Sequence, residues 1–240
     1  MNPGHRPVAL ITGASQGIGA AVARLLAPRY DLILGGRDEQ RLADLIEELA
    51  AAGPVNARAL PVEVTDDAAL AEALSRIDRL DALVHSAGTG ELGTVEETSA
   101  ATWRAQFDVN VVAVAEATRL LLPALRAAGT DTGADVVLVN SGSGITAKAG
   151  WGSYAASKFA LRAFGDALRA EESGNGVRVT SVHPGRVDTA MQRHVVAQEG
   201  GGEYDGSTFL RPESVAAAVL TALTATRDAH LTEIVLRQQA

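Results

Sequence analysis

The chain has 240 residues, of which 47% are hydrophobic and 21% charged, so it has enough apolar residues for a sizeable core and general disorder is excluded. Its net charge of −8 and its aromatic content of only 4% argue against a nucleic-acid partner. Cysteine is absent and the five histidines show no metal-ligand spacing, so we expect neither disulfides nor a metal site.

Short apolar runs alternate with helical patterns along the whole chain. Continuous Val, Leu and Ile runs are typical of parallel strands buried on both faces. The predicted strands are Val8–Thr12, Asp31–Gly35, Ala57–Val62, Ala82–His85, Asp135–Asn140, Val177–Val182 and Glu233–Leu236. The predicted helices are Ile18–Ala27, Glu39–Ala52, Ala68–Ile77, Thr102–Ala128, Tyr154–Glu172 and Glu213–Thr224. This order predicts an α/β fold, with residues 1–240 forming one doubly wound Rossmann-type domain around a parallel sheet of about seven strands and helices on both faces.

Several residues mark the ends of these helices. Asp38, Asp66 and Ser99 are plausible N-caps, because their side chains can accept from free N–H groups of a first turn. Gly53 and Gly129 are plausible stops.

The first predicted strand leads into a glycine-rich turn, Thr12–Gly19, with the sequence TGASQGIG. Glycines let the backbone turn tightly and approach a pyrophosphate, and the helix that follows points its positive end at the same group. The spacing is Gly-x3-Gly-x-Gly rather than the commoner G-x-G-x-x-G. Such a turn can merely permit close packing, but its position between strand and helix favours dinucleotide binding.

Tyr154 and Lys158 lie four residues apart on one predicted helix, so the phenol and the ammonium share a face. A nearby cation lowers the pKa of a phenol from about 10, which makes tyrosine usable as a general acid or base. The pair alone is also compatible with an ordinary amphipathic helix. Lysine is rare here, however, since arginine outnumbers it 19 to 2.

As a set, these motifs resemble those of the short-chain dehydrogenase/reductase family over essentially the full chain. The family's Thr-Gly-x3-Gly-x-Gly matches Thr12–Gly19, and its Tyr-x3-Lys matches Tyr154–Lys158. Its helix asparagine, its serine thirteen residues before the tyrosine, and its Pro-Gly with a later threonine fall on Asn110, Ser141, Pro184-Gly185 and Thr189.

The resemblance implies hydride transfer between a nicotinamide and a carbonyl or alcohol carbon. It implies that Tyr154 gives the proton in the reductive direction and that Ser141 polarises the carbonyl. Lys158 would bind the nicotinamide ribose and tune Tyr154, and Asn110 would hold a water in a proton relay. The implied catalytic residues are Asn110, Ser141, Tyr154 and Lys158. The implied cofactor-binding residues are Gly13, Ser15, Gln16, Gly17, Ile18, Gly19, Arg37, Glu63, Val64, Ser86, Ala87, Gly88, Tyr154, Lys158, Pro184, Gly185, Val187 and Thr189.

Two positions depart from the family pattern. The family's Asn-Asn-Ala-Gly is replaced by His85–Gly88, which removes an asparagine side chain that ties neighbouring strands. Glu63 replaces the family's aspartate near the adenine. We interpret His85 as a core residue, His183 as a strand-end residue, and Ser143 as a turn residue.

The end of the second strand predicts the cofactor. Gly36 stands where NAD-preferring relatives carry an acid, and Arg37 follows with a guanidinium that suits a 2′-phosphate. Asp38 is the competing ribose ligand, although it is better placed as an N-cap. Gln16 stands where some NADP-binding relatives carry a second basic residue. We therefore expect NADP(H) to be preferred over NAD(H).

The substrate is expected to be a small carbonyl or alcohol compound of undefined identity. The pocket walls are expected after Gly88, in Ile145–Trp151, and in Met191–Ser207, which includes glycines 200–202 and is interpreted as a mobile lid or a passive surface loop. Trp151 and Met191 suggest an apolar lining, and Arg193 and His194 could meet an anionic group; the alternative for either pair is that it points to solvent.

Other functions and assemblies remain to be weighed. A catalytically silent dinucleotide sensor is the main alternative, and the intact Ser141, Tyr154 and Lys158 count against it. An α/β hydrolase is disfavoured, because the G-x-S-x-G run at Gly13–Gly17 belongs to the glycine-rich turn and is not interpreted as a nucleophile elbow. The resemblance implies a homodimer or homotetramer through the helices at 102–128 and 154–172. No apolar run is long enough for a membrane span and the first residues lack a signal-peptide core, so we expect a cytoplasmic protein without a membrane partner.

Overall fold

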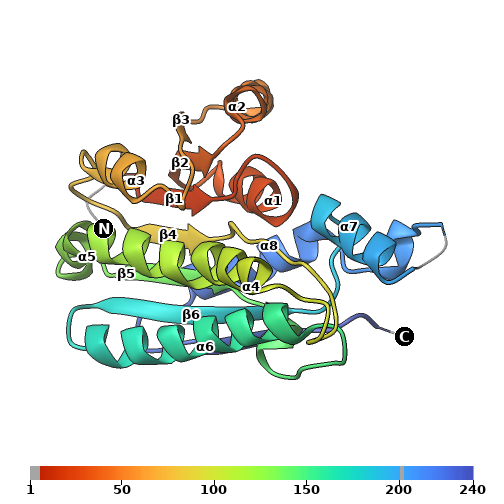
Figure 1. Cartoon of the computed structure of the whole chain (residues 1–240). Helices are drawn as coiled ribbons and strands as arrows, with labels where there is room; N and C mark the ends of the chain where they lie inside the picture. Colours follow the sequence, from red (N-terminus) through yellow and green to blue (C-terminus); the bar gives the residue numbers. More distant parts are fainter. Residues whose placement is uncertain (1–5, 201–202, 240) are drawn as a thin grey trace.

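The computed structural model describes residues 6–200 and 203–239, which form a seven-stranded parallel sheet in the order β3-β2-β1-β4-β5-β6-β7 (Figure 1). The strands are β1 (Val8–Thr12), β2 (Asp31–Gly36), β3 (Ala57–Pro61), β4 (Ala82–His85), β5 (Ala134–Val139), β6 (Val177–Pro184) and β7 (Glu233–Leu236). The α-helices are α1 (Gly17–Leu26), α2 (Glu39–Ala52), α3 (Asp67–Leu74), α4 (Ala100–Phe107), α5 (Ala113–Gly129), α6 (Gly152–Glu172), α7 (Ala190–Gln198) and α8 (Pro212–Thr224). The doubly wound α/β fold is thus confirmed.

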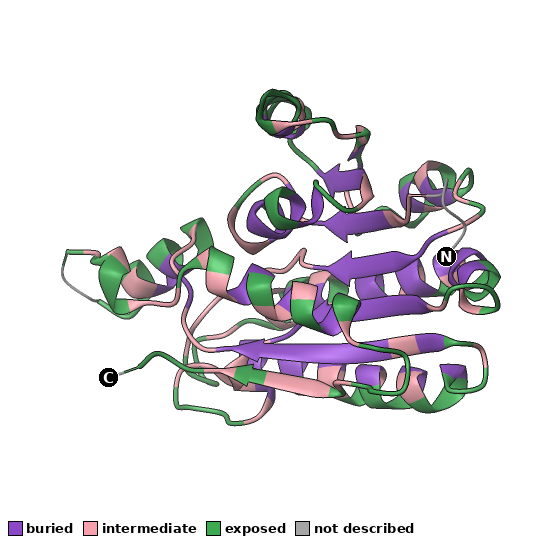
Figure 2. Cartoon of the chain, turned by 180° about the vertical axis from the view of Figure 1, so that it is seen from behind, coloured by how far each residue is buried: buried purple, intermediate pink, exposed green. Residues whose placement is uncertain are grey.

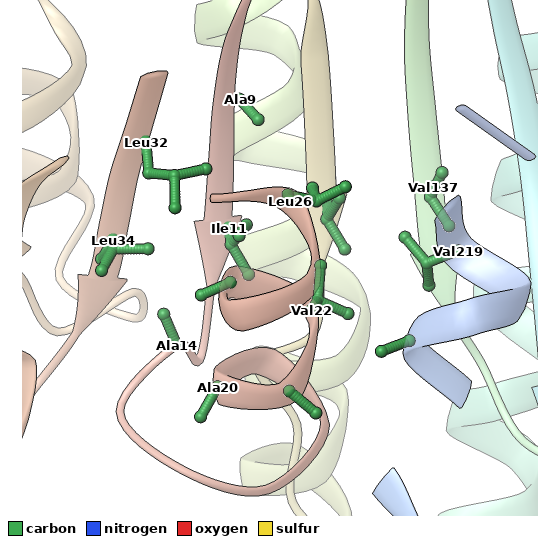
Figure 3. Close-up of a cluster of buried hydrophobic side chains, with 14 of the residues drawn as sticks. Ala9, Ile11, Ala14, Ala20, Val22, Leu26, Leu32, Leu34, Val137 and Val219 are labelled. Carbon is green, nitrogen blue, oxygen red and sulfur yellow. The ribbon is translucent and has the colours of Figure 1, made fainter. Parts of the chain in front are cut away.

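Two apolar clusters cover the two faces of the sheet. On one face α1, α2 and α8 pack together, and on the other α3, α5 and α6 do so. Figure 3 shows the first cluster, where Val22 and Leu26 of α1 and Val219 of α8 lie against the strands. Figure 2 shows the central strands buried and the edge strand β7 partly exposed. Burial on both faces explains why the central strands are continuous apolar runs.

The predicted helix starts are confirmed where a side chain caps them. Asp38 accepts from the backbone N–H of Arg41 at 3.0 Å, and Asp66 and Ser99 make the equivalent bonds at the starts of α3 and α4. Gly53 and Gly129 also lie at helix ends, as predicted.

The structure corrects two predictions about helices. The single helix expected over Thr102–Ala128 is divided by a π-helical segment, Asp108–Val112, which carries Asn110. The stretch Met191–Ser207, expected to be a loop, instead continues helix α7 as far as Gln198 and includes a short 3₁₀ turn at Gly206–Thr208. Gly201 and Gly202 of that stretch lie outside the described residues.

All strands run in parallel, so their carboxyl ends meet at one edge of the sheet. The strand order reverses between β1 and β4, and the crevice at such a switch point is where doubly wound folds bind ligands. The glycine turn after β1 and the segments after β4, β5 and β6 all open at this edge.

Candidate functional site

The backbone conformation and close packing of the turn between β1 and α1 require its glycines. Gly13 adopts a φ of +67°, and a Cβ there would lie 2.7 Å from the backbone nitrogen of Ala87. Gly17 has a φ of +56°, and a Cβ on Gly19 would collide with the carbonyl of Gly13. Larger residues at Gly13 and Gly19 would therefore collide with the protein backbone, so glycine is what lets the turn pack this closely.

The first turn of α1 is open to an anion. Its N-cap, Gln16, makes no side-chain capping bond, and the first turn contains no acidic residue. The Gln16 side chain instead accepts from Arg41 at 2.9 Å. Free N–H groups and the helix dipole fit the pyrophosphate of a dinucleotide, so the residues present agree with the predicted cofactor.

The ends of β1 and β4 are joined although the family's asparagine is missing. The Thr12 hydroxyl accepts from the backbone N–H groups of Ser86 and Ala87, both at 3.1 Å, and so joins the ends of β1 and β4. His85 itself is buried and bonded to Thr118 at 2.9 Å, as expected of a core residue. Burial lowers the pKa of His85 to about 3, so its imidazole is neutral.

Ser141, Tyr154 and Lys158 converge on one cavity of about 320 Å³ at the carboxyl edge of the sheet. Ser141 follows β5, and Tyr154 and Lys158 share a face of α6 with the ammonium 5.9 Å from the phenol ring centroid. The predicted cofactor residues that also line the cavity are Ile18, Ser86, Gly88, Pro184, Gly185, Val187 and Thr189. The others, including Arg37, Glu63 and Val64, do not line it.

The Ser141 hydroxyl is held in a definite orientation. Its oxygen accepts from the backbone N–H of Ser143 at 3.1 Å, within the 3₁₀ turn Gly142–Gly144. The hydroxyl hydrogen is therefore left to donate into the cavity. Ser143 is a turn residue, as predicted, although it also lines the cavity.

Burial moves the two titratable groups of the site toward their neutral forms. It raises the pKa of Tyr154, and a hydrogen bond with Ser141 offsets part of that rise. It lowers the pKa of Lys158 to about 8, and the ammonium donates to the carbonyl of Val139 at 3.3 Å. We expected Lys158 to lower the pKa of Tyr154, but in this structure burial is the dominant influence on the phenol.

Asn110 and Gln106 clamp the segment that follows β4. The amide of Asn110 accepts from Thr89 N–H at 3.0 Å and donates to the Thr89 carbonyl at 2.9 Å and to the Ser157 hydroxyl at 3.0 Å. Both amide hydrogens are thus used, so the relay role expected of Asn110 stays a prediction. Gln106, also completely buried, holds residue 91 in the same way and donates to Ser153 at 2.6 Å.

The clamped segment in turn holds helix α7 over the cavity. The Glu91 carboxylate contacts His194 at 2.9 Å and Gln198 at 2.5 Å, while Met191 and Val195 of the same helix line the cavity. Arg193 pairs with Asp188 at 3.2 Å. Neither His194 nor Arg193 lines the cavity, so the prediction that they meet a substrate anion is not supported by their positions.

Two arginines lie beyond the carboxyl end of β2: Arg37 directly follows the strand, and Arg41 is in the first turn of α2. Arg37 is 78% exposed and makes an ion pair with Glu63 at 3.3 Å. Asp38 caps α2 with one oxygen and pairs with Arg41 through the other at 3.1 Å, so both oxygens already have a partner within the protein. Gly36 leaves room beside them, because a Cβ there would make only ordinary contacts at 3.5 Å.

Sequence reasoning missed Gln106, Glu91 and Arg41. Gln106 lies four residues before Asn110, and this i, i+4 pair of amides on a helix was the available signal. Arg41 follows the N-cap by three residues on the first turn of α2. No sequence signal indicated Glu91, whose partners lie 103 and 107 residues away.

Within residues 6–200 and 203–239, no three His, Cys, Asp or Glu side chains come together in a way that could hold a metal ion. No helix there combines the length and apolar character that crossing a bilayer requires. His183, at the end of β6 as predicted, is buried against the carbonyl of Ser141 at 3.0 Å.

A doubly wound fold with a glycine turn, Ser141, and a Tyr-x3-Lys pair at one cavity defines a class of dinucleotide-dependent oxidoreductase. Comparison with known proteins agrees: the model of the family described as short chain dehydrogenase matches residues 7–200. The chain belongs to the short-chain dehydrogenase/reductase family.

The curated relatives include two of similar identity. Sulfoacetaldehyde reductase 2 of Chromohalobacter salexigens is 34% identical over 238 residues, covering 93% of this chain and 90% of its own. Glycine betaine reductase ATRR of Emericella nidulans is 34% identical over 237 residues, but the chain spans only 18% of that longer protein. Among solved structures, an alcohol dehydrogenase from the archaeon Thermococcus sibiricus, complexed with 5-hydroxy-NADP, superposes with a TM-score of 0.83 at 29% identity over 98% of both chains.

Proposed function

We propose that this chain is an NADPH-dependent reductase that interconverts a carbonyl and a secondary alcohol, with the whole chain acting as one dinucleotide-binding domain. The observation that carries the proposal is the convergence of Ser141, Tyr154 and Lys158 on one cavity beside an open glycine turn. The archaeal relative solved with 5-hydroxy-NADP supports a nicotinamide dinucleotide as the cofactor.

Each side chain has a role that follows from its surroundings. Tyr154 is the general acid, because its raised pKa keeps the phenol protonated and able to give its proton to the carbonyl oxygen. The Ser141 hydroxyl, which is hydrogen-bonded to Tyr154 in this structure, donates to that carbonyl oxygen when a substrate is bound. Lys158 offers a buried cation 5.9 Å from the phenol ring and stabilises the phenolate that remains. A bound nicotinamide supplies the hydride.

Asn110 and Gln106 act by positioning. They fix the backbone of residues 89 and 91, and this segment packs on the phenol ring, where a Cβ on Gly90 would lie 3.2 Å from a Tyr154 ring carbon. The catalytic phenol is thereby held between this segment and Trp151, whose ring meets it edge-on at 5.9 Å between centroids.

Substitution of Tyr154 tests the reaction. Tyr154→Phe keeps the ring but removes the proton, so turnover should fall by at least ~10²-fold while cofactor affinity stays unchanged. Tyr30→Phe, a tyrosine that does not line the cavity, is the matched control. Near-normal turnover in folded Tyr154→Phe would rule out this tyrosine as the proton donor.

The preference for NADPH rests on Arg37 and the absence of an acid at Gly36. Arg37 is exposed beside the space at Gly36, and Arg41 lies close enough to hold Gln16 and Asp38. Arg37→Ala should reduce kcat/KM for NADPH by at least about tenfold more than that for NADH, because a charge-assisted bond to the 2′-phosphate is lost. Arg76→Ala, which removes an exposed arginine that does not line the cavity, serves as control. A wild-type preference for NADH would show the assignment to be wrong.

A silent dinucleotide sensor is the second candidate. It would bind NADPH with the same residues but would not oxidise it with any carbonyl. Intact Ser141, Tyr154 and Lys158 disfavour it, and an assay of NADPH oxidation against a carbonyl panel decides between the two.

The proposed assembly is a homodimer or homotetramer through helices α4, α5 and α6. Two apolar side chains support it: Val112 is 51% exposed beside α5, and Phe159 of α6 is 41% exposed. Since α6 packs against the π-helical segment that carries Val112, an interface on this side of the protein would cover both side chains.

A further inference from the structure

The cavity carries charge of only one sign. Its charged lining residues are all basic, Lys148, Lys158, Arg186 and Arg237, and none of the described lining residues is acidic. The chain as a whole has the opposite balance, with 29 acidic against 21 basic residues. The site where a substrate would bind thus has the opposite charge balance to the chain as a whole.

Two of these cations already have partners or roles. Lys158 belongs to the proposed catalytic set. Arg186 is neutralised by Glu199 at 2.5 Å and stacks over Phe209 at 5.1 Å.

Lys148 and Arg237 remain available. Within the described parts of the chain neither has a carboxylate partner, and both are exposed at the cavity. Arg237 donates only through Nη1, to the carbonyls of His183 at 3.3 Å and Leu236 at 3.0 Å. Its Nε and Nη2 are therefore left to bind a ligand. Lys148 lies 5.9 Å from the Trp151 ring centroid.

Arg237 and Lys148 lie close to Ser141 and Tyr154 of the proposed catalytic set. Arg237 approaches the turn after Ser141 so closely that a Cβ on Gly142 would lie 3.4 Å from its Nη1. Lys148 is linked to Tyr154 through Trp151, whose ring contacts both. Neither cation is among the residues assigned to the dinucleotide, so the cofactor does not account for them.

Nearby carboxylates do not compete for these cations. Four carboxylates on the segments around the cavity are bonded to other partners: Glu91 to His194 and Gln198, Asp188 to Arg193 and Tyr204, Glu199 to Arg186, and Glu233 to Arg162.

We propose that the substrate of this site is an anionic carbonyl compound, whose carboxylate or equivalent oxyanion is bound by Arg237 and Lys148 while its carbonyl meets Ser141 and Tyr154. This inference rests on the proposed reductase function. The guanidinium suits a planar carboxylate, and the ammonium adds a second charge-assisted bond. Apolar Leu92, Trp151 and Met191 of the cavity contact the carbon skeleton between the two groups.

A panel of matched substrates tests the proposal. Aliphatic and aromatic keto acids, 4-oxopentanoate, 3-acetylbenzoate and 4-acetylbenzoate, are each compared with their methyl esters for NADPH oxidation. We expect kcat/KM for at least one acid to exceed that for its ester by at least about tenfold, as one charge-assisted bond would give. Because salt screens exposed charges, this ratio should fall toward one in high salt. In Lys148→Met/Arg237→Gln the preference should vanish while the ester rates change less than about twofold.

A second arm separates this inference from the proposed function. Calorimetric binding of the same acids and esters to the NADPH-loaded protein needs no turnover, and Arg76→Gln provides the control for removing a remote positive charge. Binding of acids without oxidation of NADPH would refute the reductase but support the anion site. The anion site would be refuted if acid and ester had equal kcat/KM and equal affinity in every pair. It would also be refuted if the double variant lost the same factor in kcat/KM or affinity for the acid as for the ester.

Discussion

The most quantitative prediction concerns Lys158, because this residue should support activity while its buried charge lowers the stability of the folded protein. Its side chain is 4% exposed, and burial lowers its pKa from 10.5 to about 8. Since each pKa unit equals about 1.4 kcal/mol, the folded protein carries a cost of roughly 3 kcal/mol for burying the charge at neutral pH. Lys158→Met removes this cost but also the bond to the Val139 carbonyl, which contributes about 1 kcal/mol.

The variant should therefore lose activity and become more stable at pH 7, by about 2 kcal/mol or about 4–8 °C in Tm. Below pH 8 the ammonium is charged in both the folded and the unfolded chain, so the full cost is present. Between pH 8 and 10.5 the unfolded chain binds more protons than the folded protein, so the stability of the wild type rises. From pH 7 to pH 10 the wild type should gain roughly 2–3 kcal/mol relative to the variant, so the variant's stability advantage should disappear by about pH 10.

Urea denaturation of both proteins without cofactor at pH 7, 8, 9 and 10 measures this difference. The chain's only other lysine, the exposed Lys148, supplies the control Lys148→Met. Selective isotope labelling of lysine gives two side-chain signals, and the one absent from Lys158→Met should titrate near pH 8. A stability difference that does not change with pH, or a signal titrating near 10.5, would show that the buried position imposes no such cost.

Three further predictions concern other parts of the chain. Glu91→Ala should raise the substrate KM several-fold with little change in kcat, because α7 loses its bonds to the segment after β4; an unchanged KM would contradict this role. Gly13→Ala should destabilise the protein by about 2–4 kcal/mol and weaken cofactor binding, since a positive φ and a close backbone contact both oppose a Cβ; a thermal shift assay with and without NADPH measures both effects. Phe159→Glu should shift light-scattering mass toward the monomer if α6 lies at the interface, whereas Leu25→Glu on α1 should not.

The sequence predicted most of the fold because buried strands and capped helices leave local signals. β1, β4, β7 and α2 have the predicted bounds, and the three side-chain caps hold the helices where expected. The candidate site also followed from local spacing, since the glycine turn is contiguous and Tyr154 and Lys158 share one helical face.

What the sequence could not predict depends on tertiary contacts. The π-helical segment around Asn110 exists where its amide pairs with the backbone of Thr89, a contact that no local pattern encodes. Helix α7 has a weakly apolar sequence and is held by Glu91, more than 100 residues earlier. The pKa of Tyr154 was misjudged for the same reason: spacing suggested the influence of Lys158, whereas the influence of burial depends on the whole fold.

The opposed pKa changes of Tyr154 and Lys158 also determine how a pH–rate profile should be interpreted. Burial favours the neutral phenol and the neutral amine, whereas their proximity favours phenolate beside ammonium. These two arrangements hold the same number of protons, so loss of one proton from the fully protonated pair leads to either. A group that titrates near pH 8 in kcat/KM would therefore belong to the pair, and assigning it to tyrosine alone would be unjustified. Because Lys158→Met leaves only one of the two groups, the apparent pKa of Tyr154 in that variant should rise above its value in the wild type.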